Sequence, residues 1–159
     1  MEKIKKVSVY LWAVVLVLVD QVTKLAIINN IKDKSITIIK GILNFTYCEN
    51  KGVAFSIGNG HVPVFIVVNL IIICGLTVYY EKNKDEFKGF LSKIFFTMVI
   101  AGGVSNLFDR IIRGFVIDFV DVSDFFNFAI FNVADIFIVI GIIGLAVNFI
   151  FQGIKISKK

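Results

Sequence analysis

The sequence predicts an all-α integral membrane protein with four transmembrane helices and a small β-hairpin on the outer face. Hydrophobic residues make up 57% of the 159 residues and the mean hydropathy is +0.86, which is too apolar for a soluble domain of this length. Four segments reach the roughly 20 apolar residues needed to cross a hydrocarbon core: residues 7–28, 62–80, 91–112 and 133–151. We therefore expect one membrane domain over residues 1–159.

The first span is expected to remain in the mature chain. Its apolar run from Val7 is long and lacks the small-residue pattern of a cleavable signal peptide. Asp20 and Lys24 lie one helical turn apart, with the acid first, which is the favourable order for an ion pair. Two interpretations stay open for this pair: a helix-end ion pair in which Lys24 extends to the membrane surface, or part of a polar site.

Both ends of the chain are expected on the cytoplasmic side. The N-terminal segment, the loop 81–93 and the C-terminal tail hold most of the lysines and arginines, and basic residues accumulate in cytoplasmic loops. The loops 29–61 and 113–132 then face outward. The net charge of +5 is accordingly interpreted as a signal of topology, and no nucleic-acid partner is expected.

The first outer loop has the pattern of a β-hairpin. Apolar side chains occupy every second position over 43–47 and again over 53–57, and the polar turn sequence 49–52 lies between these runs. The outer β region is therefore expected over about 35–58. Pro63 follows in the first turn of the second helix, where its missing N–H costs little.

The third span becomes polar before it ends. It contains Asn106, Asp109 and Arg110, residues that hydrocarbon penalises by several kcal/mol each unless they are paired or face a polar cavity. Gly102 and Gly103 are small enough for a neighbouring helix to approach closely. One interpretation is a packing seam with polar contacts between helices. The other is a site in which Arg110 and Asp109 hold nearby carboxylates and loops.

Polar residues of three spans are predicted to lie at one depth. A helical rise of ~1.5 Å per residue places Asp20 roughly 20 Å, Asn106 about 18 Å and Asp135 about 24 Å from the inner boundary of a core about 30 Å thick. Insertions of polar residues at random would not share a level. The pattern therefore indicates a polar pocket in the outer third of the membrane that opens outward.

Four carboxylates belong to the second outer loop and the helix that follows it: Asp118, Asp121, Asp124 and Asp135. The first three recur at every third residue and would form a drifting, solvated acidic face in a helix. Asp135 begins a membrane helix, where the positive end of the helix dipole favours a carboxylate, and Asp118 is flanked by apolar residues. Two carboxylates close together in a low-dielectric site share one proton, which suits peptide hydrolysis. Spacing alone does not prove such a pair or fully rank the four.

Other hydrolytic and metal chemistries have little support in the sequence. No H-E-x-x-H motif is present, and Ser105 lacks the second glycine of a G-x-S-x-G turn. A Ser/Lys pair would require Lys24, because no other lysine shares the depth of Ser105. His61 is isolated, and Cys48 and Cys74 form no cluster with it, so no metal site, disulfide or cofactor is expected.

Five sequence blocks follow one another along the four spans. They are DQVTK (20–24), NKGVAF (50–55), GGVSNLFDR (102–110), VIDF (116–119) and FNVAD (131–135). Each block is modest evidence by itself. Together, in this order, they resemble the lipoprotein signal peptidase family of bacteria, also called signal peptidase II, and the resemblance runs through most of the chain.

The resemblance implies a membrane aspartyl endopeptidase that removes the signal peptide of prolipoproteins by cutting on the N-terminal side of a diacylglyceryl-modified cysteine. The catalytic carboxylates would be Asp118 and Asp135. Positions that support the site or hold the substrate match Asp20, Lys24, Asn50, Gly52, Asn106, Asp109, Arg110 and Asn132. The resemblance also implies an outer β-cradle, a short outer helix between the two carboxylates, inhibition by globomycin-type peptides, and an active site toward the outer leaflet of the cytoplasmic membrane. A monomer among membrane lipids is favoured.

Two residues depart from the family pattern. Ala129 stands where the family commonly has proline, and Ile136 where serine usually follows the last aspartate. Both would change how the last helix begins, and so affect rate more than reaction type.

The aromatic residues of the second outer loop have two interpretations. Phe125, Phe126, Phe128 and Phe131 would either gate lateral entry of the substrate or form an interfacial aromatic belt.

Two other classes of function fit some of the same residues. Intramembrane Asp, Asn and Arg also occur in proton relays, so a small proton-coupled transporter or channel subunit is an alternative, and a non-catalytic helix-packing partner is another. A transporter needs access from both faces, whereas the polar residues here gather at one level near the outer side. The sequence therefore favours the peptidase.

Overall fold

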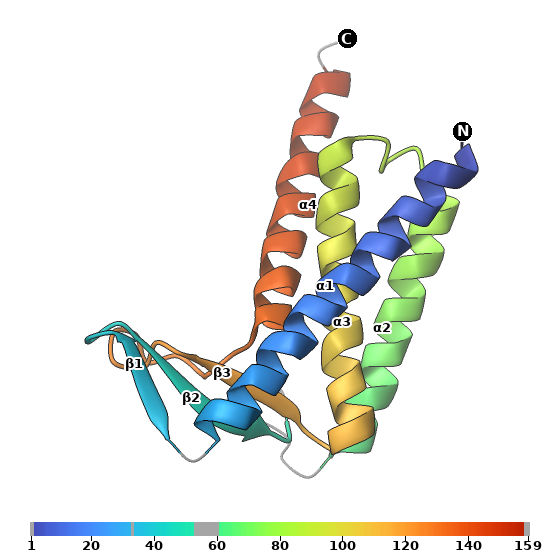
Figure 1. Cartoon of the computed structure of the whole chain (residues 1–159). Helices are drawn as coiled ribbons and strands as arrows, with labels where there is room; N and C mark the ends of the chain where they lie inside the picture. The colour runs from blue at the N-terminus through green and yellow to red at the C-terminus, as the bar shows by residue number, and fades with distance from the viewer. Residues whose placement is uncertain (1, 33, 53–60, 158–159) are drawn as a thin grey trace.

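The structure is a computed structural model that describes residues 2–32, 34–52 and 61–157. Four helices form a bundle, and a small sheet lies across one end of it (Figure 1). All four helices are long and apolar enough to cross a membrane, which confirms the predicted fold class. Their bounds are α1 (Glu2–Ile31), α2 (Val62–Lys82), α3 (Phe90–Arg113) and α4 (Val133–Ser157).

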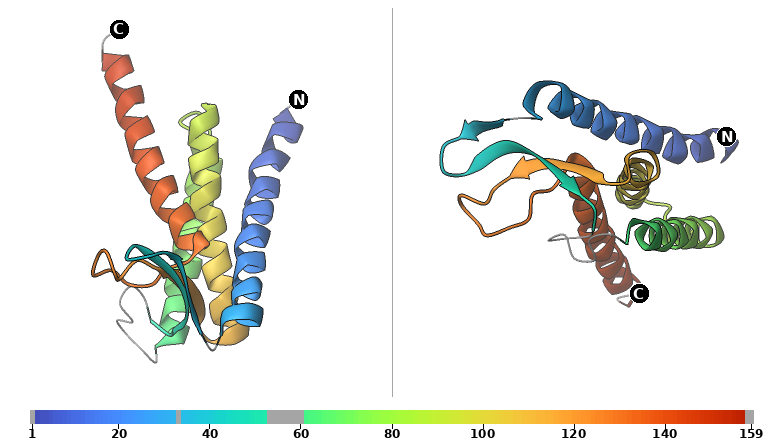
Figure 2. Two further views of the ribbon diagram at one scale, coloured as in Figure 1. Left: turned by 60° about the vertical axis from the view of Figure 1, so that its left-hand side comes forward. Right: turned by 90° about the horizontal axis from the view of Figure 1, so that it is seen from below.

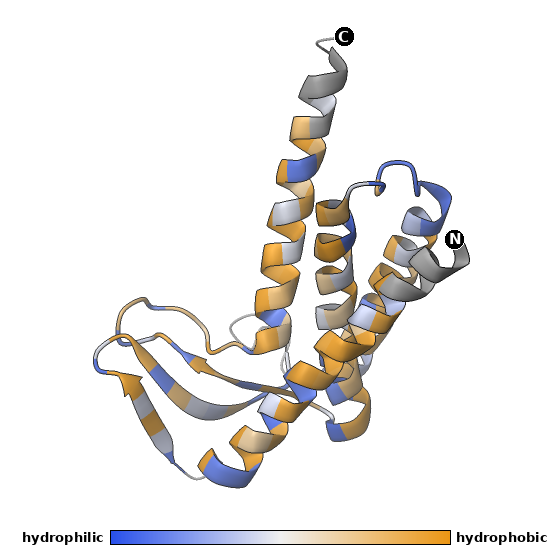
Figure 3. Ribbon diagram, turned by 45° about the horizontal axis from the view of Figure 1, so that its top comes forward, coloured by the Kyte–Doolittle hydropathy of each residue, from blue (hydrophilic) through white to orange (hydrophobic). Residues whose placement is uncertain are grey.

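The two chain ends lie together at the end of the bundle opposite the sheet (Figures 1 and 2). Apolar residues dominate the four helices, while hydrophilic residues concentrate in the loop between α2 and α3 and where the helices approach the sheet (Figure 3). Many large apolar side chains on the outside of the bundle are exposed. This distribution suits a bundle whose outer surface is covered by lipid.

The most buried helix, α3, packs against the other three. Small residues allow its close contact with α4. A Cβ on Gly102 would run into the carbonyl group of Ala134, and a Cβ on Gly144 would overlap the ring of Phe95. The role expected for Gly102 from the sequence is thus confirmed. At the end of the bundle away from the sheet, Tyr80 and Phe96 stack with ring centroids 4.3 Å apart.

The sheet has three antiparallel strands in the order β1 (Ser35–Ile39), β2 (Leu43–Asn50) and β3 (Val116–Asp121). Phe45 of β2 contacts Phe119 of β3 edge to face at 5.7 Å, and both belong to an apolar cluster with the C-terminal end of α1. The sheet is therefore anchored to the bundle by apolar packing.

The predicted hairpin is only partly correct. Residues 43–47 do form a strand, but 49–50 continue that strand instead of making a turn. The turn lies between β1 and β2, where Gly41 adopts a φ of 74°. The other neighbour of β2 is β3, which comes from a distant loop. The second strand predicted at 53–57 lies outside the described residues.

The connection from β3 to α4 contains a turn instead of the expected short helix. The N–H groups of Phe125 and Phe126 donate to the carbonyl of Val122, and the chain then runs on without regular structure. Phe131 returns to β3 and exchanges backbone hydrogen bonds with Val120 at 2.8 and 3.1 Å. This return stops the segment from continuing as a helix, and it brings the first residues of α4 beside β3.

Candidate active site

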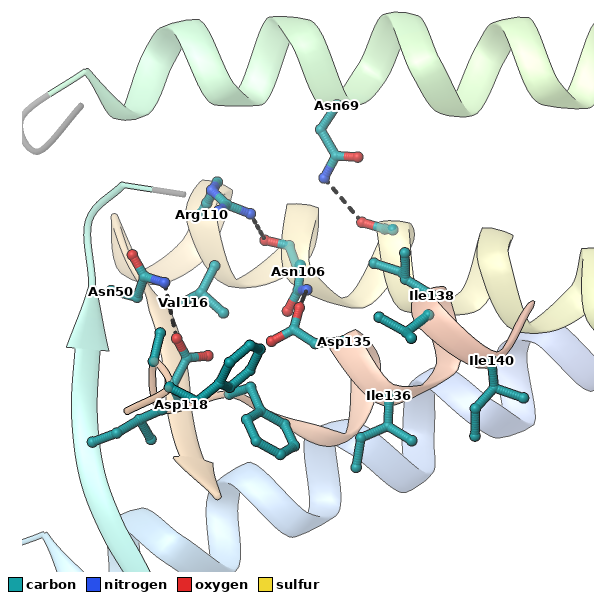
Figure 4. Close-up of a pocket in the computed structure, with 16 residues that line it drawn as sticks. Asn50, Asn69, Asn106, Arg110, Val116, Asp118, Asp135, Ile136, Ile138 and Ile140 are labelled. Atoms are coloured by element: carbon teal, nitrogen blue, oxygen red, sulfur yellow. Dashed lines mark hydrogen bonds between the residues drawn. The ribbon is translucent and has the colours of Figure 1, made fainter. Parts of the chain in front are cut away.

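A cavity of about 560 Å³ lies where the sheet meets the helices (Figure 4). Its walls come from β2, β3, three of the helices and the segment before α4. One end is polar and the other is formed largely by isoleucine and valine. The lining residues are Asn50, Asn69, Gly103, Asn106, Arg110, Val116, Asp118, Phe128, Ala129, Ile130, Phe131, Asp135, Ile136, Ile138, Val139 and Ile140.

Behind this cavity lies a cluster of charges, called here the Lys24 cluster: Lys24 with Asp20 and Asp109. The Lys24 ammonium contacts Asp20 Oδ2 at 2.7 Å and Asp109 Oδ2 at 2.8 Å. All three side chains have no exposed surface. The ammonium therefore does not extend to the membrane surface, and the helix-end interpretation of this pair is wrong.

Asp109 is held by donors from several elements. Its Oδ1 accepts hydrogen bonds from Gln21 Nε2 at 2.9 Å and from the guanidinium of Arg113. Its Oδ2 also accepts from the backbone N–H of Ile117 at 3.3 Å. Asp109 thus connects α1 and α3 to the start of β3. Two cations and two further donors keep this carboxylate fully engaged.

Asp20 connects α1 to the start of α4. Its Oδ1 accepts the backbone N–H of Ala134 at 2.8 Å, and its Oδ2 accepts the Ser105 hydroxyl at 2.6 Å. The first N–H groups of a helix have no partner within that helix, so a carboxylate from α1 satisfies one of them. The negative charge also interacts favourably with the dipole of α4.

Two asparagines join the Lys24 cluster to the cavity. Asn106 Oδ1 accepts from Lys24 Nζ and from Asn132 Nδ2, each at 3.1 Å. The other end of the same amide, Asn106 Nδ2, donates to Asp135 Oδ1 at 2.7 Å. One amide therefore contacts both the buried cation and the half-buried Asp135 carboxylate.

Asn132 forms the cap of α4 and touches both cavity carboxylates. Its Oδ1 accepts the Asp135 N–H at 2.9 Å, and Asp135 Oδ2 accepts the Asn132 N–H at 3.1 Å. This reciprocal pair is a capping box. The remaining group, Nδ2, donates to Asp118 Oδ1 at 2.7 Å. The helix start thereby sets the positions of Asp118 and Asp135 together.

Asp118 lies in β3 and is 2% exposed. Its Oδ2 accepts from Asn50 Nδ2 at 2.9 Å, and Asn50 Oδ1 in turn accepts the Gly52 N–H at 3.0 Å. Burial and then the nearby charge of Asp135 raise the pKa of Asp118 to about 7, although hydrogen bonds from Asn50 and Asn132 lower it. This carboxyl group therefore keeps its proton close to neutral pH.

Arg110 holds the segment after β2 against α3. Its Nη2 donates to the carbonyl of Gly52 at 2.9 Å, and its Nη1 to the carbonyl of Asn106 at 3.3 Å. The guanidinium also lies 6.0 Å from the ring centroid of Phe65. Among the described residues, no cation forms an ion pair with Asp118 or Asp135, so Arg110 acts on them only at longer range.

Asp121 and Asp124 lie away from the cavity. Because β3 is a strand, residues three apart point to opposite faces, so Asp121 cannot share the environment of Asp118. Burial raises the pKa of Asp121, but hydrogen bonds from Ser123 and Thr46 outweigh this effect and bring it below its usual range. Asp124 is exposed and accepts an amide N–H from β2 at 2.9 Å. The structure thus separates four carboxylates that the sequence spacing left together.

Several residues contribute to the site or its support in ways that the sequence analysis did not predict. Gln21 bridges α1 and α3 by donating to Ser105 Oγ and Asp109, while its Oε1 accepts from Arg113. Ser105 is buried and donates to Asp20, so it is not exposed as a nucleophile. Asn69 lines the cavity from α2. The signal for Asn69 was available, because an amide in an otherwise apolar span is unusual.

The aromatic loop divides into two parts. Phe128 and Phe131 line the cavity and contact each other edge to face at 5.8 Å, whereas Phe125 and Phe126 are exposed beyond it. Ala129 and Ile136, where the sequence departs from the family pattern, also line the cavity.

In the part of the chain that the structure describes, no group of three or more His, Cys, Asp or Glu is arranged to hold a metal ion.

Four membrane-length helices and two carboxylates held by shared amides at an internal cavity define an integral membrane protein with a site suited to acid–base hydrolysis. The sequence profile described as "Signal peptidase (SPase) II" matches residues 12–151. The chain belongs to the signal peptidase II family, and it is a multi-pass bacterial membrane protease.

Similar proteins agree with this family over most of their length. A lipoprotein signal peptidase of Halothermothrix orenii is 36% identical over 150 residues, which cover 94% of this chain and 99% of that protein. One of Streptococcus agalactiae serotype Ia is also 36% identical, over 144 residues, which cover 90% and 92%. A bacterial membrane enzyme solved by the in meso method at 2.3 Å superposes with a TM-score of 0.82 at 32% identity, covering 92% of this chain and 89% of that one.

Proposed function

We propose that this protease cleaves prolipoproteins by an aspartyl mechanism, with Asp118 and Asp135 as the catalytic pair. The observation that carries the proposal is the arrangement around Asn132, whose amide contacts one carboxylate while its backbone and side chain cap the other. Both carboxylates line one cavity, and their described hydrogen-bond donors are amides. Such partners orient a carboxylate without cancelling its charge, so the pair can exchange a proton.

The reaction would follow from one shared proton. The ionised carboxylate takes a proton from a water molecule, whose oxygen attacks the scissile carbonyl carbon. The protonated carboxyl group gives its proton to the carbonyl oxygen, forming a tetrahedral intermediate. Its collapse breaks the C–N bond: the carboxyl group that took the proton from water gives it to the departing amine, and a hydroxyl of the intermediate returns its proton to the other carboxylate, which restores the shared proton. The raised pKa of Asp118 supports one retained proton near neutral pH, and apparent pKa values measured for the reaction would belong to the pair.

The apolar end of the cavity suits a lipid-modified substrate. Ile136, Ile138, Val139 and Ile140 form one wall beside the carboxylates. The similar proteins are named lipoprotein signal peptidases. We infer the same substrate class here: a prolipoprotein cut on the N-terminal side of a diacylglyceryl-modified cysteine, with globomycin-type peptides as inhibitors of the pair. Asp20, Lys24, Gly52, Asn106, Asp109 and Arg110 would support the site through the contacts described above.

We infer from the lysine distribution that the sheet, and with it the active site, lies toward the outer leaflet. In a background with Cys48→Ser and Cys74→Ser, a membrane-impermeant maleimide should label Lys40→Cys in intact spheroplasts and leave Lys88→Cys unlabelled. Labelling of Lys88→Cys alone would show that the topology is the opposite of the one proposed.

The cleavage test uses the purified chain in detergent and one prolipoprotein prepared with and without the diacylglyceryl group. We expect cleavage before the cysteine only in the lipidated form, blocked by globomycin and absent in Asp118→Asn. Equal cleavage of both forms would show that the enzyme does not recognise the diacylglyceryl group. A folded wild-type chain that cleaves neither form would contradict the proposed function.

Phe128 and Phe131 are the aromatic residues placed to gate lateral entry of the substrate, because they form part of the cavity wall. Phe128→Ala should change KM or kcat, whereas Phe126→Ala should change neither, since Phe126 is exposed and is not among the lining residues. If Phe128→Ala also leaves both constants unchanged, the gate is excluded and the aromatic residues form an interfacial belt.

A further inference from the structure

Helix α2 contributes a single residue to the cavity wall, and that residue is an amide. Over residues 62–73 of α2, the half-buried positions are Val62, Phe65, Ile66, Asn69 and Ile73. Of these only Asn69 is polar, and it is the only described α2 residue that lines the cavity (Figure 4). Polar side chains within membrane spans are costly and usually serve a function.

Among the described residues, one end of the Asn69 amide has a partner and the other has none. Its Nδ2 donates to the backbone carbonyl of Gly103 at 3.1 Å. A carbonyl group can only accept, so this contact fixes which end of the amide is nitrogen. Asn69 Oδ1 lies 3.6 Å from the point that a Cβ on Gly103 would occupy, beside a part of α3 that lines the cavity. No described residue donates to Asn69 Oδ1. Asn69 and Gly103 both line the cavity, so this oxygen is placed to accept a donor from a bound substrate.

The distance along the bundle between this acceptor and the carboxylates can be estimated from their contacts with helix α3. Asn69 contacts α3 at Gly103, and Asp135 contacts it at Asn106. Three residues at a rise of about 1.5 Å separate these levels by about 4.5 Å along the helix. An extended chain advances roughly 3.3 Å per residue. A substrate held at the carboxylates therefore passes Asn69 within one or two residues, on the side away from the sheet.

The substrate has an unpaired donor to offer at this position. A protease cuts an extended segment, so the last residues of an apolar signal helix must unwind before the scissile bond. Each freed N–H in a membrane costs several kcal/mol unless it finds an acceptor. We propose that Asn69 is a substrate-positioning residue whose Oδ1 accepts a backbone N–H from one of the residues just before the cleavage site. This inference rests on the proposed function.

The test combines Asn69→Leu with backbone N-methylation of a lipidated peptide substrate, one position at a time over the three residues before the cysteine. Asn69→Leu should raise KM about tenfold, the effect of one hydrogen bond, with little change in kcat. At one position, N-methylation should raise KM for the wild type and cause no further rise in the variant. This loss of additivity identifies a direct contact.

The matched control is Asn148→Leu, which removes another interhelical amide contact, from Asn148 Nδ2 to Ser92 Oγ at 2.9 Å, away from the cavity. It should leave KM and the N-methyl pattern unchanged. If N-methylation and Asn69→Leu are additive at all three positions, Asn69 is only a packing contact and the inference is overturned. If the wild type cleaves no peptide, the proposed function fails instead, so the two failures are distinguishable.

Discussion

The molecule contains two pairs of aspartates side by side, and they differ in their partners. Asp20 and Asp109 share the ammonium of Lys24 at 2.7 and 2.8 Å. Asp118 and Asp135 instead accept hydrogen bonds from asparagine amides, with no described cation in ion-pair contact. The first pair is fully buried, while the second lines the cavity.

The difference in partners supports a structural role for the first pair and the proposed catalytic role for the second. A buried cation between two carboxylates cannot be removed without leaving charge uncompensated. Amide donors orient a carboxylate but carry no charge that opposes its protonation. Asn106 and Asn132 connect the two pairs, so the charged cluster holds the cavity carboxylates in place.

The largest effect should come from the cavity pair. Asp118→Asn and Asp135→Asn keep the size of each side chain, replace one accepting oxygen with an NH2 group and cannot transfer a proton, so cleavage should fall about 10²–10⁴-fold. Thermal unfolding in detergent should change little. Asp121→Asn is the control, since Asp121 lies outside the cavity wall. An inactive Asp121→Asn with an active Asp118→Asn would overturn the assignment.

The Lys24 cluster should respond in stability. Lys24→Met leaves two buried carboxylates without their shared cation, a change that costs about 3–5 kcal/mol. Differential scanning fluorimetry in detergent should show a lower Tm, and adding Asp109→Asn should recover part of it. Lys88→Met removes only an exposed ion pair with Asp85 and should have no measurable effect. An unchanged Tm in Lys24→Met would show that the cluster is not a structural element.

Asn132 tests the connection between the two pairs. Asn132→Ala removes the cap of α4 and the contact to Asp118, so it should cost about 1 kcal/mol of stability and reduce activity. Asn132→Ser restores a cap but is too short to reach Asp118. Its Tm should therefore recover while its kcat stays low. Recovery of both would mean that the cap alone positions Asp118.

The smallest effect is a pH dependence. The pKa of Asp118 is raised from 3.8 to about 7, first by burial and then by Asp135. The folded chain keeps a proton that the unfolded chain releases, so the stability from this group is present below pH 3.8 and is lost as the pH rises through about 7. Tm should decline across this window less in Asp118→Asn than in the wild type. The kcat should also fall above about pH 7, because the shared proton is lost. If the Tm of the wild type and that of Asp118→Asn depend on pH in the same way, the pKa of Asp118 is not raised.

Much of the fold follows from the sequence because a membrane imposes a length on every apolar segment. The four runs were long enough to be recognised, and counting residues brought Asp20, Asn106 and Asp135 to one level. Their contacts in the structure support that estimate: Asp20 caps α4 at Ala134, and Asn106 donates to Asp135. The alternation over 43–47 also identified β2, whose Phe45 packs inward.

What only the tertiary structure decided is which elements pair. The sheet joins β2 to β3 across a long stretch of sequence, and no local pattern records such a pairing. That pairing makes Asp118 a strand residue facing the cavity and Asp121 a residue of the opposite face. It also brings Asn132 against Asp118. Segment length and polarity are local properties set by the solvent, whereas the partners of a carboxylate depend on chain segments that only folding brings together.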